Sequence, residues 1–540
     1  MRGRVEMHDK TLYHDANIHT MDPRYRRASA MAVVDERIIA VGTCEEAEAA
    51  LSGHYRVVDL QGFTVVPGFI DCHIHFLWYA LGARRLNLDG VASIGEVVRM
   101  VAERAAQVRP GEWILGHGWN RSLWPAADVP TRAQLDAASP ANPVALTSKD
   151  GHTMWVNSPA LAVAGIDRDT PDPGGGKIER DARTGEPTGL LRENAQALVD
   201  GVIPVPGPDA CEEAIAAAIP RLHEFGVVGI HDCEDELAFR AFQGLAARGR
   251  LGLRVFMMIP RQNLDAAIKI GLRTGFGDST LRVGPLKVFA DGALGSQSAA
   301  LLEPYASNRE NTGILVASRG ELEDVIFRAS QAGIAVAVHA IGDRANRMVL
   351  DAFEAVQRRG IPFPLRHRIE HAQLVHPDDL PRFASLGIIA SVQPVHATSD
   401  RYMADSHWGE RASRAYAYRS LLALGARLAF GSDAPVEPPH PIEGIFAAVT
   451  RKRADEVLLP GWHTEECLTV EQAVSGYTLG AAYASGEEAV KGSLSPGKLA
   501  DFVVLSQNIF AIRPDEIIQT KVLATIMGGD VVFDGMGLRA

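Results

Sequence analysis

Residues 67–76 read PGFIDCHIHF, and this stretch decides the fold that we predict for the chain. It joins a short apolar strand to two histidines, His73 and His75. Side chains two apart in a strand point to the same face, so both imidazoles can enter one site while Cys72 and Ile74 point away from it. Two converging imidazoles suit a borderline cation such as zinc. Taken alone, the pattern also fits two ordinary strand histidines.

The middle of the chain repeats an apolar strand followed by an amphipathic helix. This alternation is typical of a parallel sheet covered by helices. Eight candidate strands can be counted, which is the number that closes a (β/α)8 barrel. We therefore predict an α/β protein with a TIM-type barrel over residues 67–489. The candidate strands are TVVPGFIDCHIH (64–75), GVVGIHDC (226–233), LRVFMMI (253–259), RVGPLKVFADG (282–292), GIAVAVHAIGD (333–343), HRIEHAQ (367–373), IIASVQP (388–394) and RLAFGSDAP (427–435).

The two ends of the chain, and the segment after the first barrel strand, have a different pattern. Residues 1–66 and 490–540 contain short strands between glycine or polar turns, which predicts one composite β-sandwich built from both ends. About 150 residues separate the first and second barrel strands, and a loop of that length must carry its own structure. We expect an inserted subdomain at about 77–222 that helps to shape the substrate pocket.

The composition restricts the classes of partner. The 540 residues carry a formal net charge of −12 and no basic block, which argues against nucleic acid or an anionic membrane as a partner. No apolar run is long enough to span a membrane, and the first residues lack the apolar stretch of a secretory signal. The five cysteines show no paired spacing. We expect a cytoplasmic protein that acts on a small molecule. The sequence leaves open whether the protein forms a homodimer.

Further side chains of metal-ligand type follow other candidate strands. Lys287 lies in the fourth, His339 and His371 close the fifth and sixth, and Asp433 follows the eighth. Each has an ordinary interpretation by itself, such as a core histidine, a helix N-cap for Asp433 or a lysine whose amine reaches water. Active sites of barrels gather at the carboxyl ends of the strands. Together, these residues predict a metal centre at one mouth of the barrel.

The motifs around these residues resemble the amidohydrolase superfamily, in particular its YtcJ-like branch, which includes N-substituted formamide deformylase. The resemblance covers nearly the whole chain. It rests on PGFIDCHIH, KVFADGALGSQSA, VAVHAIGD, HRIEHAQ, FGSDAPV and the closing GSLSPGKLADFVVL.

This resemblance implies a binuclear site, with two Zn²⁺ ions as the expected cofactors. One metal is the more buried, the other is the more exposed, and a lysine carboxylated by carbon dioxide bridges them. A desolvated amine is nucleophilic enough to capture carbon dioxide. If the lysine stays unmodified, a single-metal site remains open. The implied ligands are His73, His75 and Asp433 for the buried metal, which would also form the single-metal site, His339 and His371 for the exposed metal, and Lys287 as the bridge.

The implied reaction is hydrolysis of an amide-type C–N bond, in an N-substituted formamide, a linear amide or a carbamate. The nucleophile would be a metal-bridging hydroxide, and Asp433 would move the proton to the leaving amine. Several tryptophans in the insertion suggest an apolar or aromatic substituent on the nitrogen. Residues in the insertion or beyond strand ends are candidates for contact with the substrate. They are His117, His152, Trp155, Asp291 and Gln393.

Three alternatives stay open. A deaminase of the same superfamily generally carries a glutamate three residues after the fifth-strand histidine, whereas this chain has Gly342. A cyclic amide hydrolase is the second alternative. A non-catalytic assembly protein built on the barrel would lose metal ligands, whereas all six positions are filled here.

Overall fold

The computed structural model describes residues 9–125, 129–148, 151 and 153–538. They divide into two compact units. One unit combines Met1–Tyr79 with Ile215–Ala540, and the other is Ala80–Ala214. The predicted barrel lies in the first unit and the insertion forms the second.

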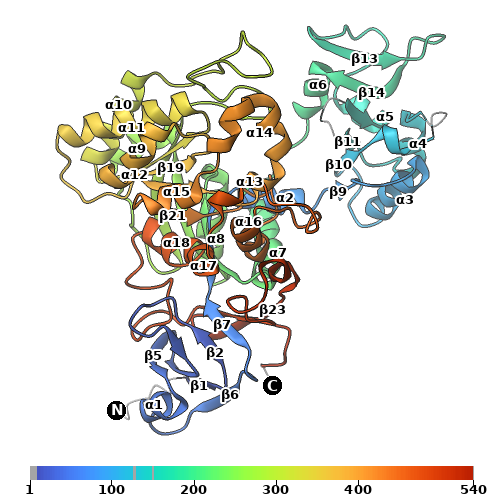
Figure 1. Cartoon of the computed structure of the whole chain (residues 1–540). Helices are drawn as coiled ribbons and strands as arrows, with labels where there is room; N and C mark the ends of the chain where they lie inside the picture. Colours follow the sequence, from blue (N-terminus) through green and yellow to red (C-terminus); the bar gives the residue numbers. More distant parts are fainter. Residues whose placement is uncertain (1–8, 126–128, 149–150, 152, 539–540) are drawn as a thin grey trace. The chain divides into compact units, whose positions relative to one another are not determined.

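An eight-stranded parallel sheet forms the centre of the first unit (Figure 1), in the order β21-β20-β19-β18-β17-β16-β15-β8. Its ends meet because the Asp433 amide donates to the His73 carbonyl at 2.7 Å and the His75 amide donates to the Ala434 carbonyl at 2.9 Å. The barrel predicted from the sequence is confirmed. Its strands are β8 (Phe69–Ile74), β15 (Val227–Asp232), β16 (Arg254–Pro260), β17 (Leu281–Phe289), β18 (Val336–Ala340), β19 (Arg368–His371), β20 (Ile389–Val392) and β21 (Arg427–Phe430).

Helices that follow the strands cover the outside of the barrel (Figure 1). On β8, Ile70 and Cys72 pack against the alanines of α18, so their side chains face the helical layer as the strand alternation predicts. The opposite face of β8 carries His73 into the barrel. The covering helices are α8 (Glu236–Ala247), α10 (Arg319–Gln331), α11 (Asp343–Arg358), α12 (Leu380–Leu386), α15 (Tyr418–Ala423) and α18 (Leu479–Ala484).

Two further sheets in this unit contain strands from both ends of the chain. The order β5-β4-β1-β6 forms one, and β24-β23-β22-β7-β2-β3 forms the other. Both contribute to one apolar core, which contains Met31 from the first sheet and Val65 and Phe502 from the second. A buried ion pair of 2.7 Å between Arg254 of β16 and Asp501 ties this region to the barrel. The strands are β1 (Lys10–His14), β2 (Asn17–His19), β3 (Arg27–Ala28), β4 (Ala30–Val34), β5 (Arg37–Gly42), β6 (Arg56–Asp59), β7 (Thr64–Pro67), β22 (Phe502–Leu505), β23 (Val522–Met527) and β24 (Asp530–Asp534).

The second unit has its own sheet, in the order β13-β14-β12-β11-β10-β9. Neighbouring residues Ala145 and Leu146 of β11 belong to different apolar clusters, so the sheet is covered on both faces. The strands are β9 (Leu86–Asn87), β10 (Ile114–Trp119), β11 (Val144–Ser148), β12 (Thr153–Val156), β13 (Gly176–Arg180) and β14 (Pro187–Glu193), and the helices that pack on them include α3 (Ile94–Ala105), α4 (Arg132–Ala138) and α5 (Ser158–Val163).

Within the described residues, no helix is both long and apolar enough to cross a membrane.

Candidate metal centre

Three buried side chains, two from barrel strands and one from the segment that follows β21, converge at the carboxyl end of the sheet. One ligand atom from each of His73, His371 and Asp433 lies within 4.8 Å of the other two. His371 and Asp433 have left-handed backbone conformations, with φ of 72° and 61°. Such conformations are uncommon for residues other than glycine. Neighbouring residues of a regular strand point to opposite faces, but both Glu370 and His371 contact the ring of His73. The regular alternation of β19 therefore ends at His371.

The other predicted ligands adjoin this group. The Lys287 amine lies 3.3 Å from Nε2 of His73, and Nε2 of His75 lies 3.4 Å from Oδ1 of Asp433. The rings of His339 and His371 are 4.6 Å apart. The structure therefore brings all six predicted ligands together. His73, His371 and Asp433 lie in one group. The resemblance implies that His73 and Asp433 bind one metal and that His371 binds the other.

Hydrogen bonds to the protein orient three of the imidazoles. Nδ1 of His73 lies 2.5 Å from the Glu370 carboxylate, which leaves Nε2 facing the centre. Nδ1 of His371 donates to Oε1 of Gln393 at 2.8 Å, and Nε2 of His339 donates to a backbone carbonyl at 3.0 Å. Ligating histidines usually donate their second ring N–H in this way, which fixes the tautomer. The donor set fits a divalent metal, with Nε2 of His73, Nε2 of His371 and Nδ1 of His339 available.

The electrostatics favour the protonation states that bind a metal. Burial, together with the charge of Lys287, lowers the pKa of His73 and of His339 to about 4. Burial would raise the pKa of Asp433, but the hydrogen bond with His75 and the neighbouring imidazoles hold it well below its usual range. At neutral pH these groups are therefore neutral imidazoles and an ionised carboxylate, the forms that coordinate metals.

A charged network inside the barrel supports His73, and the sequence analysis missed it. Oε1 of Glu370 lies 2.6 Å from Nε of Arg368, and the guanidinium of Arg368 lies 2.9 Å from Nδ1 of His231. Burial would raise the pKa of Glu370, but Arg368 and His73 hold it below its usual range. The sequence did carry a signal for this network, because the R-x-E pattern of HRIEHAQ places two charges on one face of a buried strand.

Asp291, which we expected to contact substrate, holds backbone amides in the structure. Its side chain is buried, and its carboxylate accepts three backbone N–H bonds, from Ala300 at 2.8 Å, Ile341 at 3.0 Å and Gly342 at 2.9 Å. Burial raises its pKa to about 7. Asp291 thus fixes the loop after β17 to the end of β18, and its carboxylate is occupied by protein.

Gln393, which we also expected to contact substrate, orients a predicted metal ligand in the structure. It is buried after β20, and its carbonyl oxygen is used by the ring of His371. The sequence placed Gln393 beyond a strand end but could not show which partner it meets there.

Three residues of the insertion, His117, His152 and Trp155, are predicted from the sequence to contact substrate. His152 lies outside the described residues. His117 is exposed on β10. Trp155 is fully buried in the core of its own unit, where its ring lies 6.3 Å from that of Trp119 and 6.2 Å from that of Trp124. Each of these three indoles donates to a backbone carbonyl, which satisfies its N–H in the interior. Trp155 is therefore a core residue and not a surface for substrate.

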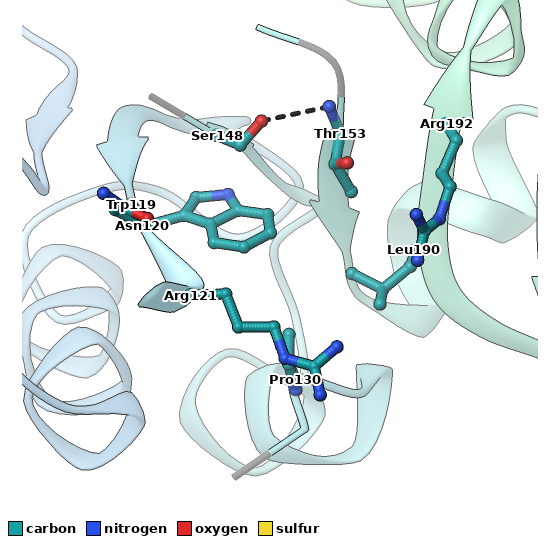
Figure 2. Close-up of a pocket in the computed structure, with 8 residues that line it drawn as sticks. All are labelled: Trp119, Asn120, Arg121, Pro130, Ser148, Thr153, Leu190 and Arg192. Carbon is teal, nitrogen blue, oxygen red and sulfur yellow. Dashed lines mark hydrogen bonds between the residues drawn. The ribbon is translucent and has the colours of Figure 1, made fainter. Parts of the chain in front are cut away.

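The insertion contains a hollow of about 440 Å³, lined by arginines, hydroxyls and an amide as well as by apolar residues (Figure 2). Arg121 and Arg192 reach toward this hollow, and Nε of Arg192 lies 2.8 Å from a carboxylate oxygen of Glu179.

An exposed tryptophan near the predicted ligands belongs to the barrel unit and not to the insertion. Trp78, on α2 (Phe76–Gly82), is 53% exposed, and its ring lies 6.0 Å from that of His75.

The family of the chain follows from comparison with known proteins. The model of the amidohydrolase family matches residues 56–533. The chain belongs to the amidohydrolase family. The resemblance noted in the sequence is thereby confirmed.

Relatives of known name match this amidohydrolase over nearly its full length. The YtcJ protein of Bacillus subtilis (strain 168) is 34% identical over 535 residues, which cover 97% of this chain and 99% of the relative. The N-substituted formamide deformylase of Arthrobacter pascens is 30% identical, covering 97% of this chain and 98% of the enzyme. Among solved structures, an uncharacterized metal-dependent hydrolase from Pyrococcus horikoshii OT3 is 29% identical with a TM-score of 0.78, covering 94% of this chain and 99% of the other.

The position three residues after His339, at which we expected a glutamate in a deaminase, is closed to a side chain in this amidohydrolase. Gly342 precedes α11, and a Cβ atom added to it would lie 2.0 Å from the carbonyl oxygen of Ala300. Real Cβ atoms do not approach a backbone oxygen so closely. A glutamate three residues after His339 would require the backbone of the loop after β17 to move.

Proposed function

We propose that this chain is a metal-dependent hydrolase that cleaves the C–N bond of an N-substituted formamide or of a similar linear amide or carbamate. The observation that carries the proposal is the convergence of His73, His371 and Asp433, with their supporting hydrogen bonds, at the carboxyl ends of the barrel strands. The formamide deformylase among the relatives supports the substrate class.

The metal centre would be held by the six residues predicted from the sequence, with zinc as the metal we favour. Imidazole and carboxylate ligands suit zinc, although other divalent metals share this preference. When bound, such metals supply Lewis acidity that activates water and polarises a carbonyl group. Carboxylation of Lys287 is part of the proposal, since its amine lies within 3.3 Å of Nε2 of His73.

In this reaction Asp433 moves the proton. Water adds its oxygen to the carbonyl carbon, the C–N bond breaks, and the proton lost by the water is delivered to the nitrogen of the leaving amine. An ionised carboxylate is required for the first transfer, and the low pKa of Asp433 keeps it ionised. Oδ1 of Asp433 lies 3.5 Å and 3.4 Å from the Nε2 atoms of His73 and His75, and Oδ2 lies 3.9 Å from Nε2 of His396.

Trp78 is our candidate for recognition of the nitrogen substituent. It is the large apolar side chain that is exposed beside His75 within the barrel unit. A flat aromatic surface near the reacting centre would favour a benzyl or aryl amine over a charged one.

The test combines metal analysis with a substrate panel. Purified protein is analysed for divalent metals, and release of amine is followed with zinc present for N-benzylformamide, aryl carbamates, N-acyl amino acids and cyclic ureas. We expect more than one metal ion per chain, loss of turnover on chelation, and the highest kcat/KM for a small acyl group on an apolar amine. A fully active metal-free protein would contradict the proposal, and turnover of cyclic ureas alone would favour the cyclic amide hydrolase.

A further inference from the structure

A histidine outside the predicted ligand set lies near Asp433. His396 is the first residue of α13 (His396–Ser399), which follows β20, and its side chain is only 5% exposed. Its ring is parallel to that of His371, with the centroids 6.2 Å apart. His396 therefore belongs to the wall of the metal centre without being one of its six predicted ligands.

One nitrogen of this ring lacks a partner. Nε2 of His396 is buried and makes no hydrogen bond to any residue that the structure describes. A buried polar group without a partner costs free energy, so its surroundings need an explanation. Nδ1 is different, because the amide Nε2 of Gln373 lies 3.5 Å from it. With the Gln373 amide in this orientation its nitrogen donates to Nδ1, which places the proton of the neutral ring on Nε2.

The second carboxylate oxygen of Asp433, Oδ2, lies near this N–H. Nε2 of His396 lies 3.9 Å from Oδ2, whereas Oδ1 of the same carboxylate faces His73 and His75. The two oxygens of Asp433 are thus assigned to different neighbours. Hydrogen bonds of catalytic groups are often long before the ligands are bound and shorten in the working complex.

We propose that His396 is a positioning residue that donates a hydrogen bond from Nε2 to Oδ2 of Asp433. The bond fixes the rotation of the carboxylate, so that Oδ1 stays beside His73 and His75 and Oδ2 stays beside His396. Gln373 contributes by selecting the tautomer. The expected effect on turnover rests on the proposed function. The effect of His396 on the Asp433 carboxylate can be measured without substrate, through the affinity for zinc.

Two amide substitutions test the proposal, because they place an N–H at different distances from the backbone. In His396→Gln the terminal nitrogen occupies nearly the place of Nε2, whereas in His396→Asn it corresponds to Nδ1 and cannot reach Asp433. His367→Asn is the matched control, because His367 is also buried with an unpartnered Nε2 but precedes β19 at the opposite end of the strand.

The first measurement is zinc affinity, by competition with a chelator, on protein whose folding is checked by circular dichroism. Residues that orient metal ligands typically change metal affinity 10- to 100-fold. We expect His396→Asn to bind zinc about 10-fold more weakly, His396→Gln to bind as the wild type does, and His367→Asn to leave the affinity unchanged. Equal affinities in all four proteins would overturn the proposal, as would equal losses in the Asn and Gln variants of His396.

The second measurement is turnover of the best substrate from the panel. We expect His396→Asn to lower kcat with KM unchanged, and His396→Gln to restore most of the rate. If the wild type binds zinc but hydrolyses nothing in the panel, the proposed function fails while the zinc titration still decides the role of His396. If the wild type is active and His396→Asn keeps both its kcat and its zinc affinity, His396 has no positioning role.

Discussion

The strongest quantitative test of the site concerns Glu370→Gln, which removes one charge from the interior of the barrel and preserves the shape. Both carboxylate oxygens of Glu370 are in use, one at 2.5 Å from His73 and the other at 2.6 Å from Arg368. The side chains of Glu370 and Arg368 are both 0% exposed. The substitution therefore leaves a buried guanidinium without its counter-charge, which costs about 3–5 kcal/mol.

A matched pair on the outside of the same barrel sets the reference. Arg366 and Glu488 form a two-pronged ion pair with both distances at 2.6 Å, but the side chains are 29% and 35% exposed. Exposed pairs of this kind contribute about 0–1 kcal/mol. Glu488→Gln should therefore lower the free energy of unfolding far less than Glu370→Gln, although both remove a carboxylate from an arginine.

The assay is urea unfolding of metal-free protein, so that zinc binding does not add to the measured stability. Zinc affinity is then titrated separately, and we expect Glu370→Gln to weaken it 10- to 100-fold because His73 loses its acceptor. Glu488→Gln should leave zinc affinity unchanged. If the two substitutions lower the free energy of unfolding equally, burial does not explain the contribution of Glu370 to stability. If Glu370→Gln leaves the zinc affinity unchanged, Glu370 does not orient His73 for metal binding.

Four further predictions concern other parts of the chain. Asp433→Asn should lower kcat about 100- to 10,000-fold in steady-state assays, as expected for loss of a general base, and near-normal turnover would leave the reaction without its proton carrier. Trp155→Ala should cost about 3–5 kcal/mol of unfolding free energy, whereas Trp78→Ala should change it by less than about 0.5 kcal/mol and raise KM for benzyl amides more than for methyl amides. Asp501→Asn should cost about 3–5 kcal/mol in denaturant unfolding, because it leaves the buried Arg254 unpaired. Chelation should lower Tm and zinc should restore it, because zinc at a free concentration of 100 Kd adds about 2.7 kcal/mol to the free energy of unfolding, and an unchanged Tm would argue against a metal centre.

The sequence by itself determined the barrel and the identity of the metal-type residues. Strand and helix periods are local properties, so the eight strands could be counted from residues that alternate or run apolar between glycine turns. The rule that parallel strands end at one mouth then placed His73, His339, His371 and Asp433 together without knowledge of any distance. The motif around His73 could be interpreted because two residues of one strand share a face.

Only the tertiary structure decided what each polar side chain meets. Asp291 and Gln393 follow strands as ligands do, yet one holds backbone amides and the other orients His371. Trp155 lies in an interior that its own sequence neighbourhood does not reveal. Glu370 and His396 reach the centre because of contacts with residues far away in sequence, and because the backbone at His371 leaves the strand conformation. Periodicity fixes which face a residue occupies, but hydrogen-bond partners and burial depend on the packing of elements that are distant in the chain.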